Sequence, residues 1–360
     1  MSQAPTPEPT PFIAPVWSDA QREADFNKWL SPLAPAYGLR LDTLRSASAD
    51  ASFRRYFRVD GEQASLIIMD APPDKEDCRP FAKVAQLMQA AHIHAPEVLA
   101  WDEASGFMLL TDLGAQTMMQ VINPDDAAAN QGLYLQAVDA LITWQLASTP
   151  GVLPPYNEAL LRRELELFPD WYIARHRGVA VEGDVRRILD DAFKVIIERN
   201  LAWPSVYVHR DFMPRNLMVA APGARLGVLD FQDAVYGPIT YDIASLMRDA
   251  FLSWDEDFCL DITIRYWDKA RKAGLPVGDD FGEFYRGVEW MGLQRHLKVA
   301  GIFARLTLRD GKPQYLADTP RFIHYIRATC ERYRELKPLL RLIERIEGIE
   351  VANGYSFGKV

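Results

Sequence analysis

The sequence predicts an α+β protein in which a small, mainly antiparallel β lobe precedes a larger, mainly helical lobe. Between residues 18 and 112, short strand-like segments alternate with polar turns and include one well-defined helical segment. From residue 113 to about 350, apolar residues recur at helical spacing in one segment after another. Hydrophobic residues make up 49% of the 360 residues and charged residues 25%, which is the balance of a soluble globular protein with enough apolar residues for a core.

Residues 1–17 read as a disordered proline-rich tail, because five prolines occur by Pro15 and no signal-like apolar core is present. A short amphipathic helix follows, and Pro80 suits the first turn of a second helix. Asp112-Leu113-Gly114 then ends the lobe. The elements expected in chain order are a helix over 19–30, strands over 52–59 and 65–69, a helix over 79–91, and strands over 97–101 and 106–110.

The larger lobe is expected to be helical except for one run of two short strands joined by a loop, between residues 208 and 230. The helices are expected over 130–147, 158–175, 183–200, 241–252, 255–273, 281–306, 319–336 and 339–346.

Charge and cysteine content narrow the classes of partner. The net charge is -9 and there is no Lys- or Arg-rich run, which argues against nucleic acid and anionic membranes. No apolar run approaches a membrane span, and no obligate protein partner is evident. Cys78, Cys259 and Cys330 are widely spaced and form no metal-ligand pattern, so free thiols in a reducing compartment are expected. These observations indicate a cytoplasmic protein.

The most informative motif is His209-Arg210-Asp211, with Asn216 five residues after Asp211 and Asp230 nineteen residues after it. This spacing is typical of a phosphotransferase catalytic loop followed by a metal-binding carboxylate. Asp211 can accept the proton of an acceptor hydroxyl, while His209 and Arg210 brace the loop. Asn216 and Asp230 can hold Mg²⁺ on the phosphates of ATP. Any one of these residues alone would suggest a structural role, but four of them at this spacing favour the catalytic interpretation.

The stretch from Val208 to Leu246 resembles the aminoglycoside phosphotransferase and choline kinase superfamily, whose members share a protein-kinase-like two-lobe fold. Asp230 is followed by Phe-Gln-Asp instead of the Phe-Gly of protein kinases. Gly237 to Ser245 resembles the family's Gly-x-x-x-x-Asp-Leu-Ala segment. The resemblance implies that nucleotide binds between the lobes and that Asp242 is a structural brace for the catalytic loop.

A narrower resemblance is to the anomeric kinases of bacterial cell-wall recycling, which phosphorylate N-acetylmuramate and N-acetylglucosamine at C1. It covers roughly residues 40 to 325 and rests on the strings at 52–58, 69–77, 161–171, 208–246 and 289–298. It implies a small sugar and a nucleotide as ligands. The implied sugar-binding residues, on two helices of the larger lobe, are Asp170, Trp171, Arg175, Glu289 and His296.

The nucleotide site is expected in the smaller lobe, where Ser46 to Arg58 matches the position of the phosphate-covering loop of kinases. Small residues replace its glycines, and the backbone N–H groups expected to face phosphate are those of Ser48, Asp50, Ala51 and Ser52. The following strand lacks the usual lysine. Arg54 and Arg58 are assigned to the nucleotide, with Arg55 and Lys75 as other sources of the cation and Glu76 or Glu97 to orient it. Asp112 and Leu113 would present hinge backbone to the base.

Two alternatives remain open from the sequence. The first is a kinase for aminoglycosides or other small alcohols on the same scaffold, although Arg162, Arg163, Arg175 and Arg295 near the expected acceptor site disfavour a polycation. The second is a nucleotide-binding pseudokinase, which the missing strand lysine would suggest. The presence of Asp211, Asn216 and Asp230 together argues against it.

Overall fold

The computed structural model describes residues 13–49, 53–219 and 225–349, with the side chains of Ser48 and Ala49 excepted. The chain forms two compact units. The first comprises residues up to Thr117 together with Met218–Asp233, and the second comprises Met118–Leu217 and the residues from Ala234 onward. The α+β prediction is confirmed. The sequence placed the division at residue 112 and did not indicate that Met218–Asp233 returns to the first unit.

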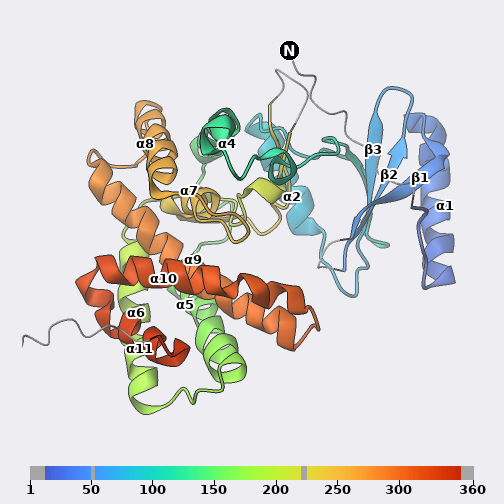
Figure 1. Ribbon diagram of the computed structural model, residues 1–360. Coiled ribbons are helices and arrows are strands. Elements are labelled where there is room, and N and C mark those ends of the chain that lie inside the picture. Colours follow the sequence, from blue (N-terminus) through green and yellow to red (C-terminus); the bar gives the residue numbers. More distant parts are fainter. Residues whose placement is uncertain (1–12, 50–52, 220–224, 350–360) are drawn as a thin grey trace, which may run out of the picture. The chain divides into compact units, whose positions relative to one another are not determined.

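The first unit contains a five-stranded antiparallel sheet with the strand order β1-β2-β3-β5-β4 (Figure 1). Strand β1 was not expected from the sequence, whereas the other four strands and α2 lie close to their predicted ranges. The elements are α1 (Ala20–Tyr37), β1 (Arg40–Ala49), β2 (Arg55–Asp60), β3 (Ser65–Asp70), α2 (Arg79–Ala90), β4 (Val98–Asp102), β5 (Phe107–Thr111) and β8 (Gly227–Val228); β7 (Leu217–Met218), at the boundary, pairs with β8.

Helix α1 covers one face of this sheet because its apolar residues face inward. Phe26 packs edge-on against Phe57 of β2 and Phe107 of β5, with ring centroids 5.7 and 5.5 Å apart. Trp17, which the sequence assigned to the tail, packs against Phe26 at 4.9 Å, and the carbonyl of Ile13 accepts a hydrogen bond from Ser46. The end of the predicted tail therefore belongs to the core of this unit, whereas residues 1–12 lie outside the described chain.

The second unit is helical apart from a short antiparallel pair, β6 and β9, and the predicted catalytic motif directly follows β6. Strand β9 was not expected from the sequence. The elements are α3 (Met118–Val121), α4 (Ala127–Leu146), α5 (Glu158–Leu165), η1 (Phe168–His176), α6 (Gly183–Leu201), β6 (Ser205–Val208), η2 (Pro214–Asn216), β9 (Val235–Pro238), α7 (Thr240–Met247), α8 (Glu256–Lys272), α9 (Phe281–Leu308), η3 (Pro313–Asp318), α10 (Thr319–Arg332), η4 (Arg334–Leu336) and α11 (Lys337–Glu347).

Helix α9 lies at the centre of this unit and packs against η1, α6, α7 and α10. It is buried on nearly all sides from Gly287 to Leu297, so its polar side chains must find partners inside the protein. Gly301 lets the backbone of Leu167 approach, since a Cβ at this position would lie 2.4 Å from the carbonyl group of Leu167. The absence of a side chain at Gly301 therefore permits η1 to pack on α9.

One predicted helix, over 158–175, is two elements in the structure. Helix α5 ends at Leu165 and is followed by a π-helix, η1, in which the N–H of Arg177 donates to the carbonyl of Tyr172 at 2.9 Å. Pro169 lacks an N–H and cannot continue the α-helical ladder. Helix α7 also stops earlier than predicted, at Met247, and the chain then runs as an irregular segment to Asp255, which caps α8.

None of the helices among the described residues is both long and apolar enough to cross a lipid bilayer.

Candidate active site

The predicted catalytic motif follows β6 directly, and its backbone is held by a buried carboxylate. Asp242, at the start of α7, accepts hydrogen bonds from the backbone N–H groups of His209 (2.7 Å) and Arg210 (3.0 Å). Burial raises the pKa of Asp242, and the nearby His209 acts to lower it. Arg210 has φ +78°, a left-handed conformation that costs energy for a residue with a Cβ. The two hydrogen bonds that Asp242 accepts hold the loop in this conformation.

Asp211 and Asn216 are joined within one tight loop. The side-chain amide nitrogen of Asn216 donates to the backbone carbonyl of Asp211 at 2.8 Å, and the backbone N–H of Asp211 lies 3.3 Å from Nδ1 of His209. The short 3₁₀ turn over Pro214–Asn216 places Asn216 opposite the start of the motif. Because its amide nitrogen serves the loop, the amide oxygen of Asn216 is the atom that suits a cation.

Beneath this loop lies a buried charge cluster, made up of Glu164, Arg210, Lys298, Gln294 and Tyr156. Glu164 accepts hydrogen bonds from Arg210 and Tyr156, lies 3.1 Å from Nζ of Lys298, and accepts from Gln294 at 3.0 Å. Burial acts to raise the pKa of Glu164, but Lys298 and Arg210 outweigh it and hold the pKa at about 2. The cluster thus holds Arg210 beside Asp211.

No sequence motif identified Glu164, Gln294 or Lys298 as part of the site. Arg295 also supports the loop, since its Nη1 donates to the carbonyl of Arg210 at 2.6 Å. The sequence nevertheless contains an indication of this cluster, because Gln294, Arg295 and Lys298 are polar residues in a largely apolar stretch of α9. Polar side chains within a helix that is buried all round indicate internal pairing.

Asp230 belongs to the first unit and lies just after β8, with φ +63°. Its Oδ1 accepts a hydrogen bond from the side-chain amide of Gln232 at 2.8 Å. The next residue, Phe231, is fully buried against Phe81 of α2, with ring centroids 4.9 Å apart. Burial of the Phe231 side chain anchors the turn that carries Asp230.

The arginines predicted to replace the strand lysine have separate partners in the first unit. Nη2 of Arg54 lies 3.1 Å from Oε2 of Glu76, and both side chains are largely buried. Arg58 makes a bidentate pair with Asp112 at 2.6 and 3.0 Å and also donates to the carbonyl of Gly114. Arg58 therefore ties β2 to the turn that contains Asp112 and Gly114.

The other predicted nucleotide residues divide into those that the structure describes and those that it does not. Arg55 pairs with Asp70, which Arg22 also contacts at 2.6 Å, and Lys75 pairs with the exposed Asp74 at 3.1 Å. Leu113 is buried. The side chain of Ser48 and all of Asp50, Ala51 and Ser52 lie outside the described residues.

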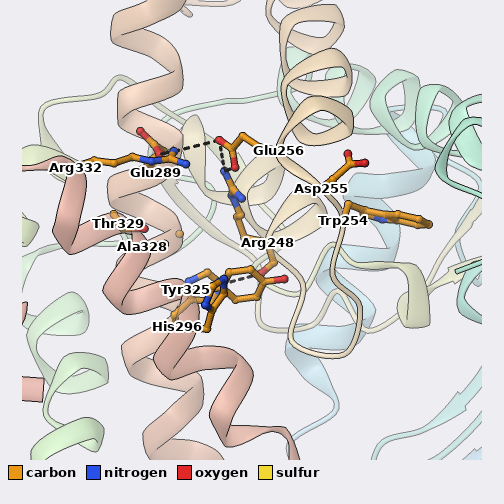
Figure 2. Close-up of a pocket in the computed structure, with 12 residues that line it drawn as sticks. Arg248, Trp254, Asp255, Glu256, Glu289, His296, Tyr325, Ala328, Thr329 and Arg332 are labelled. Carbon is orange, nitrogen blue, oxygen red and sulfur yellow. Dashed lines mark hydrogen bonds and ion pairs between the residues drawn. The ribbon is translucent and has the colours of Figure 1, made fainter. Parts of the chain in front are cut away.

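The predicted sugar-binding residues occupy two places in the second unit. On η1, the guanidinium carbon of Arg175 lies 3.8 Å from the ring centroid of Trp171, and the neighbouring Asp170 is exposed. Glu289 and His296 instead face a cavity of about 270 Å³ among α8, α9 and α10 (Figure 2).

The cavity contains both acidic and basic side chains. Arg248, at its centre in Figure 2, pairs with Glu256 at 3.1 Å, and Arg332 contacts both Glu256 and Glu289. Burial acts to raise the pKa of Glu256, but Tyr285 and the two arginines hold it at about 2. The ring of His296 stacks on Tyr325, with centroids 4.7 Å apart.

His296 lines the cavity and is only 3% exposed. Burial and the adjacent Arg248 and Arg295 lower its pKa to about 3, so the imidazole is neutral. Its Nε2 lies 3.3 Å from the backbone carbonyl of Arg248. Aromatic rings beside paired acids and bases form a site that can receive a small polar molecule.

Comparison with known proteins identifies the class of this chain. Residues 43–279 match the model of the phosphotransferase enzyme family, and the chain therefore belongs to this family. It is 49% identical to the N-acetylmuramate/N-acetylglucosamine kinase of Pseudomonas aeruginosa, a match that covers 91% of this chain and 97% of the relative. It is 46% identical to the kinase of the same name from Neisseria meningitidis serogroup B, with 94% and 100% covered.

Solved structures confirm the protein-kinase-like fold. A choline/ethanolamine kinase family protein from Mesorhizobium loti superimposes with a TM-score of 0.60 at 15% identity and covers 90% of this chain and 99% of its own. The aminoglycoside phosphotransferase APH(2'')-Ib in its ADP-bound form gives a TM-score of 0.55 at 14% identity, with 85% and 97% covered. The predicted superfamily resemblance is confirmed, and the chain is a phosphotransferase.

Proposed function

We propose that the protein is an ATP-dependent kinase that phosphorylates the anomeric hydroxyl of N-acetylmuramate and N-acetylglucosamine in peptidoglycan recycling. The observation that carries the proposal is near-50% identity, over more than nine-tenths of the chain, to a protein named for these two sugars. The described cysteines, Cys78, Cys259 and Cys330, are free and buried, which supports a reducing cytoplasmic setting.

In the proposed reaction, Asp211 orients the C1 hydroxyl and accepts its proton as the hydroxyl oxygen attacks the γ-phosphorus of ATP. The bond between the γ-phosphorus and the bridging oxygen breaks, and ADP leaves. An anomeric hydroxyl is more acidic than an ordinary alcohol, so a carboxylate is a sufficient base. Arg210, anchored on Glu164, and the backbone hydrogen bonds that Asp242 accepts would keep Asp211 in position.

We assign the magnesium ligands to Asn216 and Asp230. Among the residues described, no group of three or more His, Cys, Asp or Glu side chains could enclose a metal. A nucleotide-bound Mg²⁺ does not need such a group, since it takes one or two protein carboxylates and completes its shell with phosphate oxygens and water. An amide oxygen and a carboxylate fit this chemistry. Mg²⁺, when bound, neutralises negative charge on the phosphates.

For the nucleotide we favour Arg54 as the cation that replaces the strand lysine. Glu76 lies 3.1 Å from Arg54 and can orient it as the helix glutamate of a kinase orients its lysine. Arg58 and Asp112 are already paired with each other, so their proposed role is to hold the hinge backbone at Asp112 and Leu113 toward the base. The backbone of Ser48 to Ser52 would cover the phosphates.

The test is a coupled assay of ATP consumption with N-acetylmuramate, N-acetylglucosamine and their 1-O-methyl glycosides, with kanamycin and choline for the alternative classes. We expect turnover of the free sugars and none of the C1-blocked glycosides. Asp211→Asn should lower kcat by about 10²- to 10⁴-fold, because general-base catalysis is lost, while ATP still binds. Exposed Asp191→Asn is the matched control and should retain wild-type kcat. Wild-type turnover in Asp211→Asn would refute the role of Asp211.

A further inference from the structure

The cavity among α8, α9 and α10 is linked to the catalytic loop through two segments of the chain. On α9, Nη1 of Arg295 donates to the carbonyl of Arg210 at 2.6 Å, and the next residue, His296, lines the cavity. In the segment after α7, Arg248 lines the cavity, while the ring of Phe251 lies 4.7 Å from the guanidinium carbon of Arg215 in the catalytic loop. Helix α9 and the segment after α7 thus each contact the catalytic loop and form part of the cavity wall.

Three acidic residues line the cavity: Oδ1 of Asp255 accepts from the backbone N–H of Phe258 as the cap of α8, and Glu256 and Glu289 are occupied by side-chain donors. Glu256 accepts from Arg248 and Arg332, each at 3.1 Å, and from Tyr285. Glu289 accepts from Arg332 and from Tyr333. A ligand that offered many donor groups would have to break these bonds. The cavity is therefore suited to a ligand that presents hydrogen-bond acceptors.

Arg248 is the donor with unused capacity. Its side chain is only 12% exposed, and its hydrogen bonds to Glu256 and Tyr285 all leave from Nη2. Within the described part of the chain, its Nε and Nη1 have no hydrogen-bond partner, and neither is sealed from solvent. A guanidinium presents its nitrogens as a planar fork that matches the two oxygens of a carboxylate. Figure 2 shows this group at the centre of the cavity.

We propose that this cavity is the acceptor-sugar site and that Arg248 binds the lactyl carboxylate of N-acetylmuramate. The inference rests on the proposed function. N-acetylglucosamine lacks this carboxylate, and Glu256 then remains as the counter-ion of Arg248. Because the charge of Arg248 is compensated with either sugar, one site can bind an anionic and a neutral sugar without leaving a buried charge unpaired.

The sharpest test changes the sugar and leaves the protein intact. N-acetylmuramate is compared with its methyl ester, which removes the charge of the lactyl group and adds one methyl group. A charge-assisted hydrogen bond should make kcat/KM and calorimetric affinity about ten- to a hundredfold higher for the acid. Equal values for acid and ester in the wild-type protein would overturn the inference. Absence of turnover with every sugar would overturn the proposed function, while calorimetry would still decide the role of Arg248.

Variants then assign the effect to one residue. Arg248→Gln should bring the acid-to-ester ratio of kcat/KM to about one, because the guanidinium that distinguishes the two ligands is lost. Arg248→Lys keeps the charge beside Glu256 but loses the fork, so it should lower the ratio several-fold even if the glutamine variant does not fold. Arg286→Lys, on the exposed side of α9, is the matched control and should leave the ratio unchanged. A wild-type ratio in both Arg248 variants would refute the proposal.

Discussion

Replacing Glu164 by glutamine should destabilise the protein by about 3 kcal/mol at neutral pH. The glutamine keeps the volume of the side chain and removes only its charge. Lys298 and Arg210, whose side chains are 10% and 18% exposed, would then lose the carboxylate that they share. Removing one partner of a buried ion pair is costly, because the remaining charge has lost both water and its counter-ion.

The magnitude follows from two independent features of the site. Loss of one partner of a buried pair costs about 3 to 5 kcal/mol in other proteins. The pKa of Glu164 falls from 4.5 to about 2 on folding. At about 1.4 kcal/mol per pKa unit, this depression corresponds to about 3 kcal/mol of stability from the ionised carboxylate. The two routes agree within the range expected for a buried charge.

The assay is urea unfolding at several pH values. The folded pKa of Glu164 is depressed, so its contribution is complete above about pH 4.5 and is lost as the pH falls toward 2. The difference in unfolding free energy between wild type and Glu164→Gln should therefore be largest near pH 7 and shrink below about pH 4.5. Exposed Glu198→Gln, whose oxygen lies 4.0 Å from Lys194, should change stability by less than about 0.5 kcal/mol. A loss below about 1 kcal/mol at pH 7 for Glu164→Gln would refute the reasoning.

Two further predictions concern packing and a second buried acid. Gly301→Ala should lower the free energy of unfolding by about 1 to 3 kcal/mol, because its Cβ would meet the backbone of Leu167. Gly132→Ala, at a position with nothing within 4 Å, should instead stabilise α4 by up to about 1 kcal/mol. Thermal unfolding compares the two variants, and equal shifts in Tm would contradict the packing argument. Burial raises the pKa of Asp249 to about 6, so its ionisation destabilises the fold as the pH rises from about 4 through 6. Asp249→Asn should be more stable by about 2 to 3 kcal/mol at pH 8 and equal to wild type near pH 4, and a pH-independent difference in urea unfolding would contradict this assignment.

Local sequence patterns predicted most of the elements, for reasons that particular residues show. Helix α2 lies where apolar residues recur at helical spacing after Pro80, and β3 and β5 lie where short apolar runs end at polar turns. Strand β1 was missed because Arg40 to Ala49 is polar and small, and it becomes a strand only by pairing with β2. Strand β9 is likewise defined by its partner, β6.

The sequence by itself determined the family and the order of the two parts of the chain. It also predicted the catalytic motif, because Asp211, Asn216 and Asp230 stand at the short separations that are typical of phosphoryl-transfer enzymes. Only the tertiary structure decided which charges meet. Glu164 and Lys298 are 134 positions apart, and Arg248 and Arg332 reach the same carboxylate of Glu256 from different helices or loops. Ion pairs between distant residues leave no periodic trace in a sequence, because their partners are chosen by how the helices pack.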